Sequence, residues 1–146
     1  PGTIMLIEDN TSDIALTKRA LKKSNIANNL LVYEDGQDAL DYLFGDDPHE
    51  GNARPDLPML ILLDLKLPKL SGLEVLRRIR SNVRTQRLPV VGLTTSSEEQ
   101  DMIACYDLGA NSYVRKPIDF VHFAEAIGQL GMYWLVLNEP PPETRH

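Results

Sequence analysis

The sequence contains a single cysteine, Cys105, among 146 residues. One thiol excludes an internal disulfide and a cysteine-based zinc site, and it favours a reducing compartment. No apolar run approaches the roughly 20 residues that cross a bilayer, and the N-terminus lacks the basic start and apolar run of a signal peptide. Basic residues are fewer than acidic ones, 15 against 21. The resulting net charge of −6 argues against a non-specific binder of nucleic acid or anionic membranes, so we expect a cytoplasmic globular protein.

Short apolar runs alternate with segments of helical periodicity along the chain. The runs that read as strands lie at 3–7, 30–33, 59–63, 90–93 and 112–114. Helical patterns occupy 13–24 and 38–44, follow the capping signatures Ser71–Glu74 and Ser96–Glu99, and close with Phe123, Ile127, Leu130 and Trp134 on one stripe. Five β-α units in a row predict an α/β fold with a parallel sheet and helices on both of its faces.

The length suits one domain. We assign it to residues 1–138, with a long polar insertion at 45–58 before the third strand and a proline-rich tail at 139–146. A mobile surface position is expected for the insertion.

Polar side chains follow four of the five predicted strands. Glu8 and Asp9 come after the first strand, Asp64 after the third, Thr94 after the fourth and Lys116 after the fifth. Because parallel strands end at the same edge of a sheet, and ligands bind at that edge, these groups should converge there.

Taken singly, these residues have ordinary explanations. An aspartate after a strand is usually a turn former, a threonine there reflects β-propensity, and a lysine before proline is usually solvated. Together they are harder to explain in that way. Crowded carboxylates repel unless a cation lies among them, and oxygen ligands suit Mg²⁺ or Mn²⁺. The ammonium of Lys116 and the hydroxyl of Thr94 suit a phosphoryl group.

The segments LIEDN, LLDLKLPKLSG, LPVVGLTTS and GANSYVRKP resemble the signature segments of the response-regulator receiver family. The resemblance extends from about residue 3 to residue 135 and implies a five-stranded flavodoxin-like sheet of order 2-1-3-4-5. It also implies a phosphorylation switch that uses Mg²⁺ or Mn²⁺. We expect no DNA-binding output domain after Leu135, so that signalling occurs by contact between proteins.

The family roles fall on particular positions of this sequence. Asp64 matches the phosphoacceptor, and Lys66 matches the position whose backbone carbonyl completes the metal shell. The other matches are the acidic metal ligands Glu8 and Asp9, the switch pair Thr94 and Tyr113, and Lys116, followed by Pro117, whose peptide bond is typically cis.

The sequence departs from the usual pattern at three places. Glu8 stands where aspartate is commoner, Thr95 where a smaller residue is usual, and Ser71 where aspartate is frequent. None of these removes a group needed for phosphotransfer. Two rival functions stay open: a phosphorylation-independent pseudo-receiver, and an Asp-nucleophile phosphatase. The phosphatase would need a second acid two residues after its nucleophile, and this position is Lys66.

The insertion and the YWLVLNEPPP tail resemble those of single-domain regulators that partner phytochrome-type or other sensor histidine kinases. The last helical segment carries more apolar residues than one buried stripe uses, so we predict a homodimer built on that helix and the tail. Turnover chemistry beyond slow self-dephosphorylation is not expected.

Other conspicuous residues have mainly structural interpretations. Cys105 is expected to be a packing thiol. The arginines at 77, 78, 80, 84 and 87 are expected to form a solvated helix face balanced by Glu74, with a kinase or nucleic-acid contact as the alternative. The spacing of His49, His122 and His146 does not make a metal site.

Overall fold

The computed structural model describes residues 2–23, 28–45, 56–94, 99–115 and 125. Five parallel strands form one sheet in the order β2-β1-β3-β4-β5. The strands are β1 (Thr3–Ile7), β2 (Asn29–Tyr33), β3 (Leu60–Asp64), β4 (Val90–Thr94) and β5 (Ser112–Arg115). The described helices between them are α1 (Thr11–Lys23), α2 (Gly36–Phe44), α3 (Gly72–Ser81) and α4 (Glu99–Asp107). The predicted fold class and strand order are confirmed.

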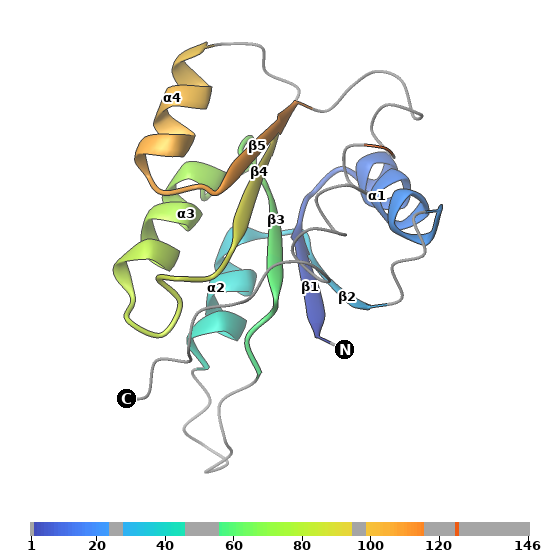
Figure 1. Ribbon diagram of the computed structural model, residues 1–146, viewed down its shortest axis with the longest axis horizontal. Helices are drawn as coiled ribbons and strands as arrows, with labels where there is room; N and C mark the ends of the chain where they lie inside the picture. Colours follow the sequence, from blue (N-terminus) through green and yellow to red (C-terminus); the bar gives the residue numbers. More distant parts are fainter. Residues whose placement is uncertain (1, 24–27, 46–55, 95–98, 116–124, 126–146) are drawn as a thin grey trace.

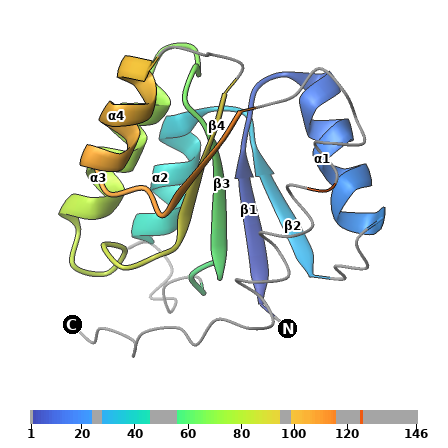
Figure 2. The ribbon, with the colours of Figure 1, turned by 45° about the horizontal axis from the view of Figure 1, so that its top comes forward.

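The described helices cover both faces of the sheet. Helices α2, α3 and α4 lie on one face and α1 lies on the other (Figures 1 and 2). Helices α2 and α3 pack side by side, and α4 follows α3 along the same face. This three-layer arrangement is what right-handed β-α-β crossovers produce when the crossover helices lie on both sides of a sheet.

The two faces of the sheet build two separate hydrophobic clusters, because side chains alternate along each strand. On the side of α2 and α3, the strand residues Met5 and Ile61 belong to one cluster with the helix residues Leu40 and Leu76. On the side of α1, the alternate strand residues pack with Ala20 and Leu21. Strands β1, β3 and β4 are buried on both faces, which explains their nearly continuous apolar sequences.

Helix starts differ from the predicted ones where a side chain caps the helix. Helix α1 begins at Thr11 rather than at residue 13, because Asn10 Oδ1 accepts a hydrogen bond from the Asp13 N–H at 2.9 Å. Helix α2 begins at Gly36 rather than at residue 38, because the Asp35 side chain caps its first turn. The Ser71 cap of α3 is confirmed, with Ser71 Oγ accepting from the Glu74 N–H at 3.2 Å.

Several predictions fall outside the described residues. They concern most of the polar insertion, the Ser96 cap, the peptide bond before Pro117, the apolar stripe from Phe123 to Trp134, and the tail. Within the described part of the chain, no helix has the length and apolar character needed to cross a membrane.

Candidate functional site

The carboxyl ends of β1, β3 and β4 bring the predicted acidic residues together. Ile7 of β1 pairs with Leu63 of β3, so Glu8, directly after β1, and Asp64, the last residue of β3, lie at neighbouring positions. Asp64 in turn pairs with Leu93, which precedes Thr94. The register of the sheet therefore places Glu8, Asp64 and Thr94 along one edge, as the strand pattern predicted.

Three carboxylates form a compact group at this edge, which we call the acidic cluster: Glu8, Asp9 and Asp64. One ligand oxygen from each lies within 4.8 Å of those of the other two. Glu8 is fully buried and Asp64 is 5% exposed, whereas Asp9 is exposed. Because buried carboxylates of like charge are costly without a cation, this all-oxygen donor set fits Mg²⁺ or Mn²⁺.

Backbone amides hold two of the three carboxylates. The Lys66 N–H donates to Asp64 Oδ1 at 2.9 Å. The Asn10 N–H donates to Glu8 Oε2 at 3.3 Å. Each bond closes a short loop within the segment that leaves the strand, so the acidic side chains are oriented before any ligand arrives.

The proposed switch residues are described only in part. Thr94 is fully buried at the end of β4, and Tyr113 is half-buried on β5 beside Gly92 of β4. Burial raises the pKa of the Tyr113 phenol, and the negative charge of Asp101 raises it further. Lys116 and Thr95 lie outside the described residues.

Gly72, at the first position of α3, lies against the backbone of Asp64 and Leu65. This contact was not predicted from the sequence. A β-carbon placed on Gly72 would lie 2.1 Å from the Asp64 carbonyl oxygen and 2.6 Å from Leu65 Cα. The Gly72 N–H also donates to the Leu65 carbonyl at 3.2 Å. Helix α3 can therefore begin directly against the backbone of the acidic cluster only because this residue has no side chain.

The Lys66 side chain makes a contact that the sequence did not predict. Its Nζ lies 3.0 Å from Asp101 Oδ2, which joins the loop after β3 to α4. The sequence offered no signal for this pair, because the two residues are far apart in the chain and each has an ordinary neighbourhood.

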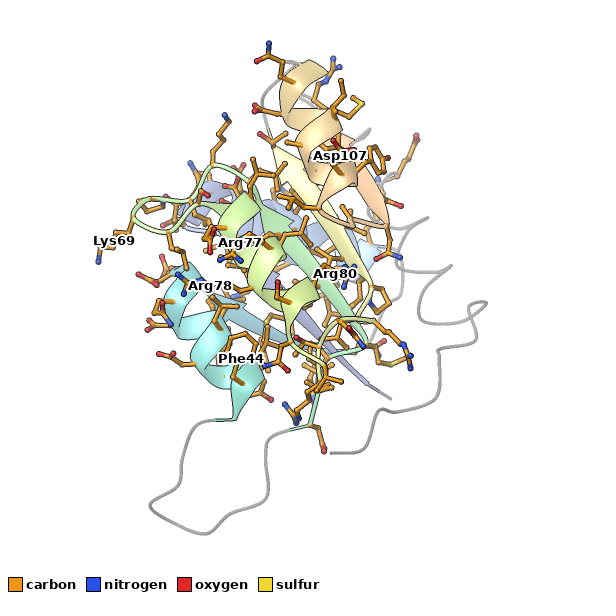
Figure 3. The ribbon with its side chains drawn as sticks, turned by 90° about the vertical axis from the view of Figure 1, so that its left-hand side faces the viewer. Phe44, Lys69, Arg77, Arg78, Arg80 and Asp107 are labelled. Carbon is orange, nitrogen blue, oxygen red and sulfur yellow. The ribbon has the colours of Figure 1, made fainter. Side chains whose placement is uncertain are left out.

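Most of the arginines on and after α3 form hydrogen bonds within the domain. Figure 3 labels the three on the helix, Arg77, Arg78 and Arg80. Arg77 and Arg78 both pair with Glu74, and their hydrogen bonds lower the pKa of Glu74 to about 2. Arg80 donates to the carbonyls of Gly109, Gln86 and Leu88 and to Asn111 Oδ1, and Arg84 donates to the Leu43 carbonyl. The predicted balance by Glu74 is correct for Arg77 and Arg78. Arg80 and Arg84 instead form hydrogen bonds with backbone groups near the ends of β4 and α2.

Cys105 is fully buried on α4, and burial raises the pKa of its thiol to about 11. This agrees with the predicted packing role, since the thiol stays protonated and inert at neutral pH. The three histidines lie outside the described residues.

A doubly wound sheet of order 2-1-3-4-5 with an acidic cluster at its carboxyl edge defines the class of flavodoxin-like receiver domains. The chain belongs to the response-regulator receiver family, whose family model, "Response regulator receiver domain", matches residues 4–128. It is therefore a signalling switch of the two-component type.

Similar proteins support this assignment over nearly the whole chain. The chain is 39% identical over 141 residues to the probable methanogenesis regulatory protein FilR2 of Methanothrix harundinacea, covering 97% of this chain and 88% of the relative. It is 39% identical over 135 residues to the response regulator Rcp1 of Synechocystis sp., covering 92% of this chain and 90% of the relative.

Two solved structures have the same fold over the same extent. The phosphorylated cyanobacterial phytochrome response regulator RcpA superposes with a TM-score of 0.85 at 36% identity, covering 97% of this chain and 99% of RcpA. The Mn²⁺-bound form of Rcp1 superposes with a TM-score of 0.84 at 38% identity, covering 97% of this chain and all of Rcp1.

Proposed function

We propose that Asp64 accepts a phosphoryl group from a phosphohistidine of a sensor histidine kinase. One observation carries the proposal: Asp64 ends β3 inside the acidic cluster, and the Lys66 amide fixes one of its carboxylate oxygens. A carboxylate oxygen attacks the phosphorus, the bond between phosphorus and the imidazole nitrogen breaks, and the histidine leaves. The product is an acylphosphate on Asp64.

The acidic cluster would hold a divalent cation, Mg²⁺ or Mn²⁺, through Glu8, Asp9 and Asp64, with the backbone carbonyl of Lys66 as a further ligand. When bound, the cation neutralises charge on the phosphoryl oxygens. The Mn²⁺-bound form of the relative Rcp1 supports a divalent cation in this chain as well.

The remaining residues respond to the phosphoryl group. Thr94, at the adjacent strand end, would donate its hydroxyl to a phosphoryl oxygen, and Lys116 would contribute its ammonium. Tyr113 would then move into the space that Thr94 leaves. The surface formed by α4 and β5 would thereby change shape, which makes the domain a two-state element biased by local charge.

The kinase is proposed to be of the phytochrome type, because the names of RcpA and of related regulators point to that class. The output is proposed to be contact with another protein rather than with DNA. The location is proposed to be the cytoplasm, because Cys105 is a free buried thiol and free thiols are typical of a reducing compartment.

Intact-mass measurement after incubation with acetyl phosphate and Mg²⁺ tests the proposed function. One stable phosphoryl adduct is expected for a receiver that at most dephosphorylates itself slowly. Release of many equivalents of phosphate would instead identify a phosphatase, and the absence of an adduct in the presence of Mg²⁺ would identify a pseudo-receiver.

Millimolar Mg²⁺ should raise the melting temperature of the protein, because a ligand that binds only the native state stabilises it. At a concentration ten times the dissociation constant the gain is about 1.4 kcal/mol, which corresponds to a few degrees. The gain should be strongly reduced in Asp9→Ala, which loses one ligand of the cluster. Differential scanning calorimetry checks this, and equal shifts in both proteins would place the cation elsewhere.

We also propose a homodimer built on the last helical segment and the tail, on the basis of their apolar sequence alone, since both lie outside the described residues. The full chain should sediment as a dimer at tens of micromolar in analytical ultracentrifugation. A form ending at Gly131 should sediment as a monomer. A monomeric full chain, with and without phosphodonor, contradicts the proposal.

A further inference from the structure

Lys66 contacts two different carboxylates, one through its side chain and one through its backbone N–H. In the structure it pairs with Asp101 of α4, with 3.0 Å between Nζ and Oδ2. The Lys66 side chain is 57% exposed and Asp101 is 18% exposed, so Asp101 is the more firmly packed partner. The pair spans the gap between the loop after β3 and helix α4.

The backbone of the same lysine is attached to the acidic cluster. The Lys66 N–H donates to Asp64 Oδ1 at 2.9 Å, and the ligand oxygens of Glu8 and Asp9 lie within 4.8 Å of that of Asp64. A lysine has a flexible four-carbon stem and a point charge with three donors. Loss of the Asp101 carboxylate would remove a restraint on the Lys66 side chain, whose ammonium group would then reach toward the cluster and place a positive charge beside it.

We propose that Asp101 is a positioning residue that holds the Lys66 ammonium away from the acidic cluster and so keeps the cluster available to a divalent cation. This inference rests on the metal site of the proposed function. It assigns a role in that site to a residue of α4 that touches neither the cation nor the phosphoryl group.

The surroundings of Asp101 support a coupling between the cluster and α4. The negative charge of Asp101 raises the pKa of the Tyr113 phenol, after the larger effect of burial, and Lys66 lowers it. The ion pair therefore lies close enough to Tyr113, the proposed switch residue, for its charges to affect the pKa of the phenol. Any displacement of α4 that separates the pair would release the Lys66 charge, and by linkage cation binding would favour the paired position of α4.

The affinity for Mn²⁺, measured by the electron paramagnetic resonance of the free ion at low salt, tests the inference. Asp101→Asn should bind Mn²⁺ about fivefold more weakly, because one unit charge moves toward the cation site. Lys66→Met and the double variant Lys66→Met/Asp101→Asn should bind alike, and at least as tightly as the wild type. The loss in Asp101→Asn should shrink as ionic strength rises.

The variant Asp107→Asn is the matched control. Asp107 is an exposed carboxylate at the end of the same helix (Figure 3), so its replacement changes the net charge equally without touching Lys66. Its affinity should stay within about twofold of the wild type, a small exposed-charge effect.

The outcomes separate this inference from the proposed function. If the wild type binds Mn²⁺ and Asp101→Asn binds it equally well, the inference is wrong and the metal site stands. Equal weakening in Asp101→Asn and in the double variant would show that Asp101 acts by supporting the fold, which also overturns the inference. If the wild type itself binds no Mn²⁺, the proposed metal site fails.

Discussion

An Asp64→Asn variant is expected to take up no phosphoryl group from acetyl phosphate, while keeping the native fold. The amide lacks the negatively charged oxygen that attacks phosphorus and forms the acylphosphate. It keeps an oxygen that accepts the hydrogen bond from the Lys66 N–H, which is 2.9 Å from Oδ1 in the structure. The loss should therefore come from chemistry and not from unfolding. Intact mass measures the first, and the melting temperature measures the second.

The control for this variant is Asp9→Asn, at the exposed member of the same cluster. It removes an equal charge but not the proposed nucleophile, so phosphorylation should be slowed and should recover in part at high Mg²⁺. No concentration of Mg²⁺ should restore Asp64→Asn. Acid-labile phosphate on Asp64→Asn at the wild-type level would falsify the assignment of the acceptor.

The fold was predictable because the sequence repeats one simple physical pattern. Strands buried on both faces must be nearly all apolar, as in MLI and LILL, and the helices between them must show an apolar stripe. The positions of Glu8, Asp64 and Thr94 followed from the same pattern, because parallel strands deliver their carboxyl ends to one edge. The order of the strands came from the family resemblance, since alternation alone does not fix it.

Features that depend on contacts between distant segments could not be read from the sequence. Arg80 looked like a surface charge, yet it bonds the Gly109 and Leu88 carbonyls and the Asn111 side chain. The capping aspartate Asp35 was missed because the helical period was first recognised two residues later. Asp101 showed no local signal of its ion pair, since the partner Lys66 lies on another element. Which side chains pair with residues distant in the sequence depends on the tertiary structure, and local periodicity does not reveal it.

Glycine at the start of α3 is a further tertiary requirement, and its replacement should have the largest effect on stability. Each of the three atoms nearest to an added β-carbon at Gly72 belongs to the backbone of Asp64 or Leu65, the nearest at 2.1 Å. Such atoms cannot turn away as a side chain does, so either α3 or the end of β3 must shift. Overpacking that displaces side chains or backbone typically costs about 1–3 kcal/mol, and occasionally more. We expect Gly72→Ala to lie at or above the upper end of that range.

Gly72→Ala should accordingly lower the melting temperature by on the order of 10 °C, since about 3 kcal/mol is lost and each kilocalorie shifts a domain of this size by a few degrees. Phosphoryl uptake at a temperature where the variant remains folded should also fall, because the strained peptide carries Asp64.

The matched control is Gly36→Ala, because Gly36 stands at the same first position of α2, directly after its cap. Its added β-carbon would meet a side-chain atom, Val75 Cγ2, at 2.6 Å, and the nearest backbone atom, the Leu70 carbonyl oxygen, only at 3.4 Å. Gly36→Ala should therefore lose less stability and keep normal phosphoryl uptake. If calorimetry and intact mass show equal losses for the two variants, the backbone of Asp64 does not limit how closely α3 approaches the site.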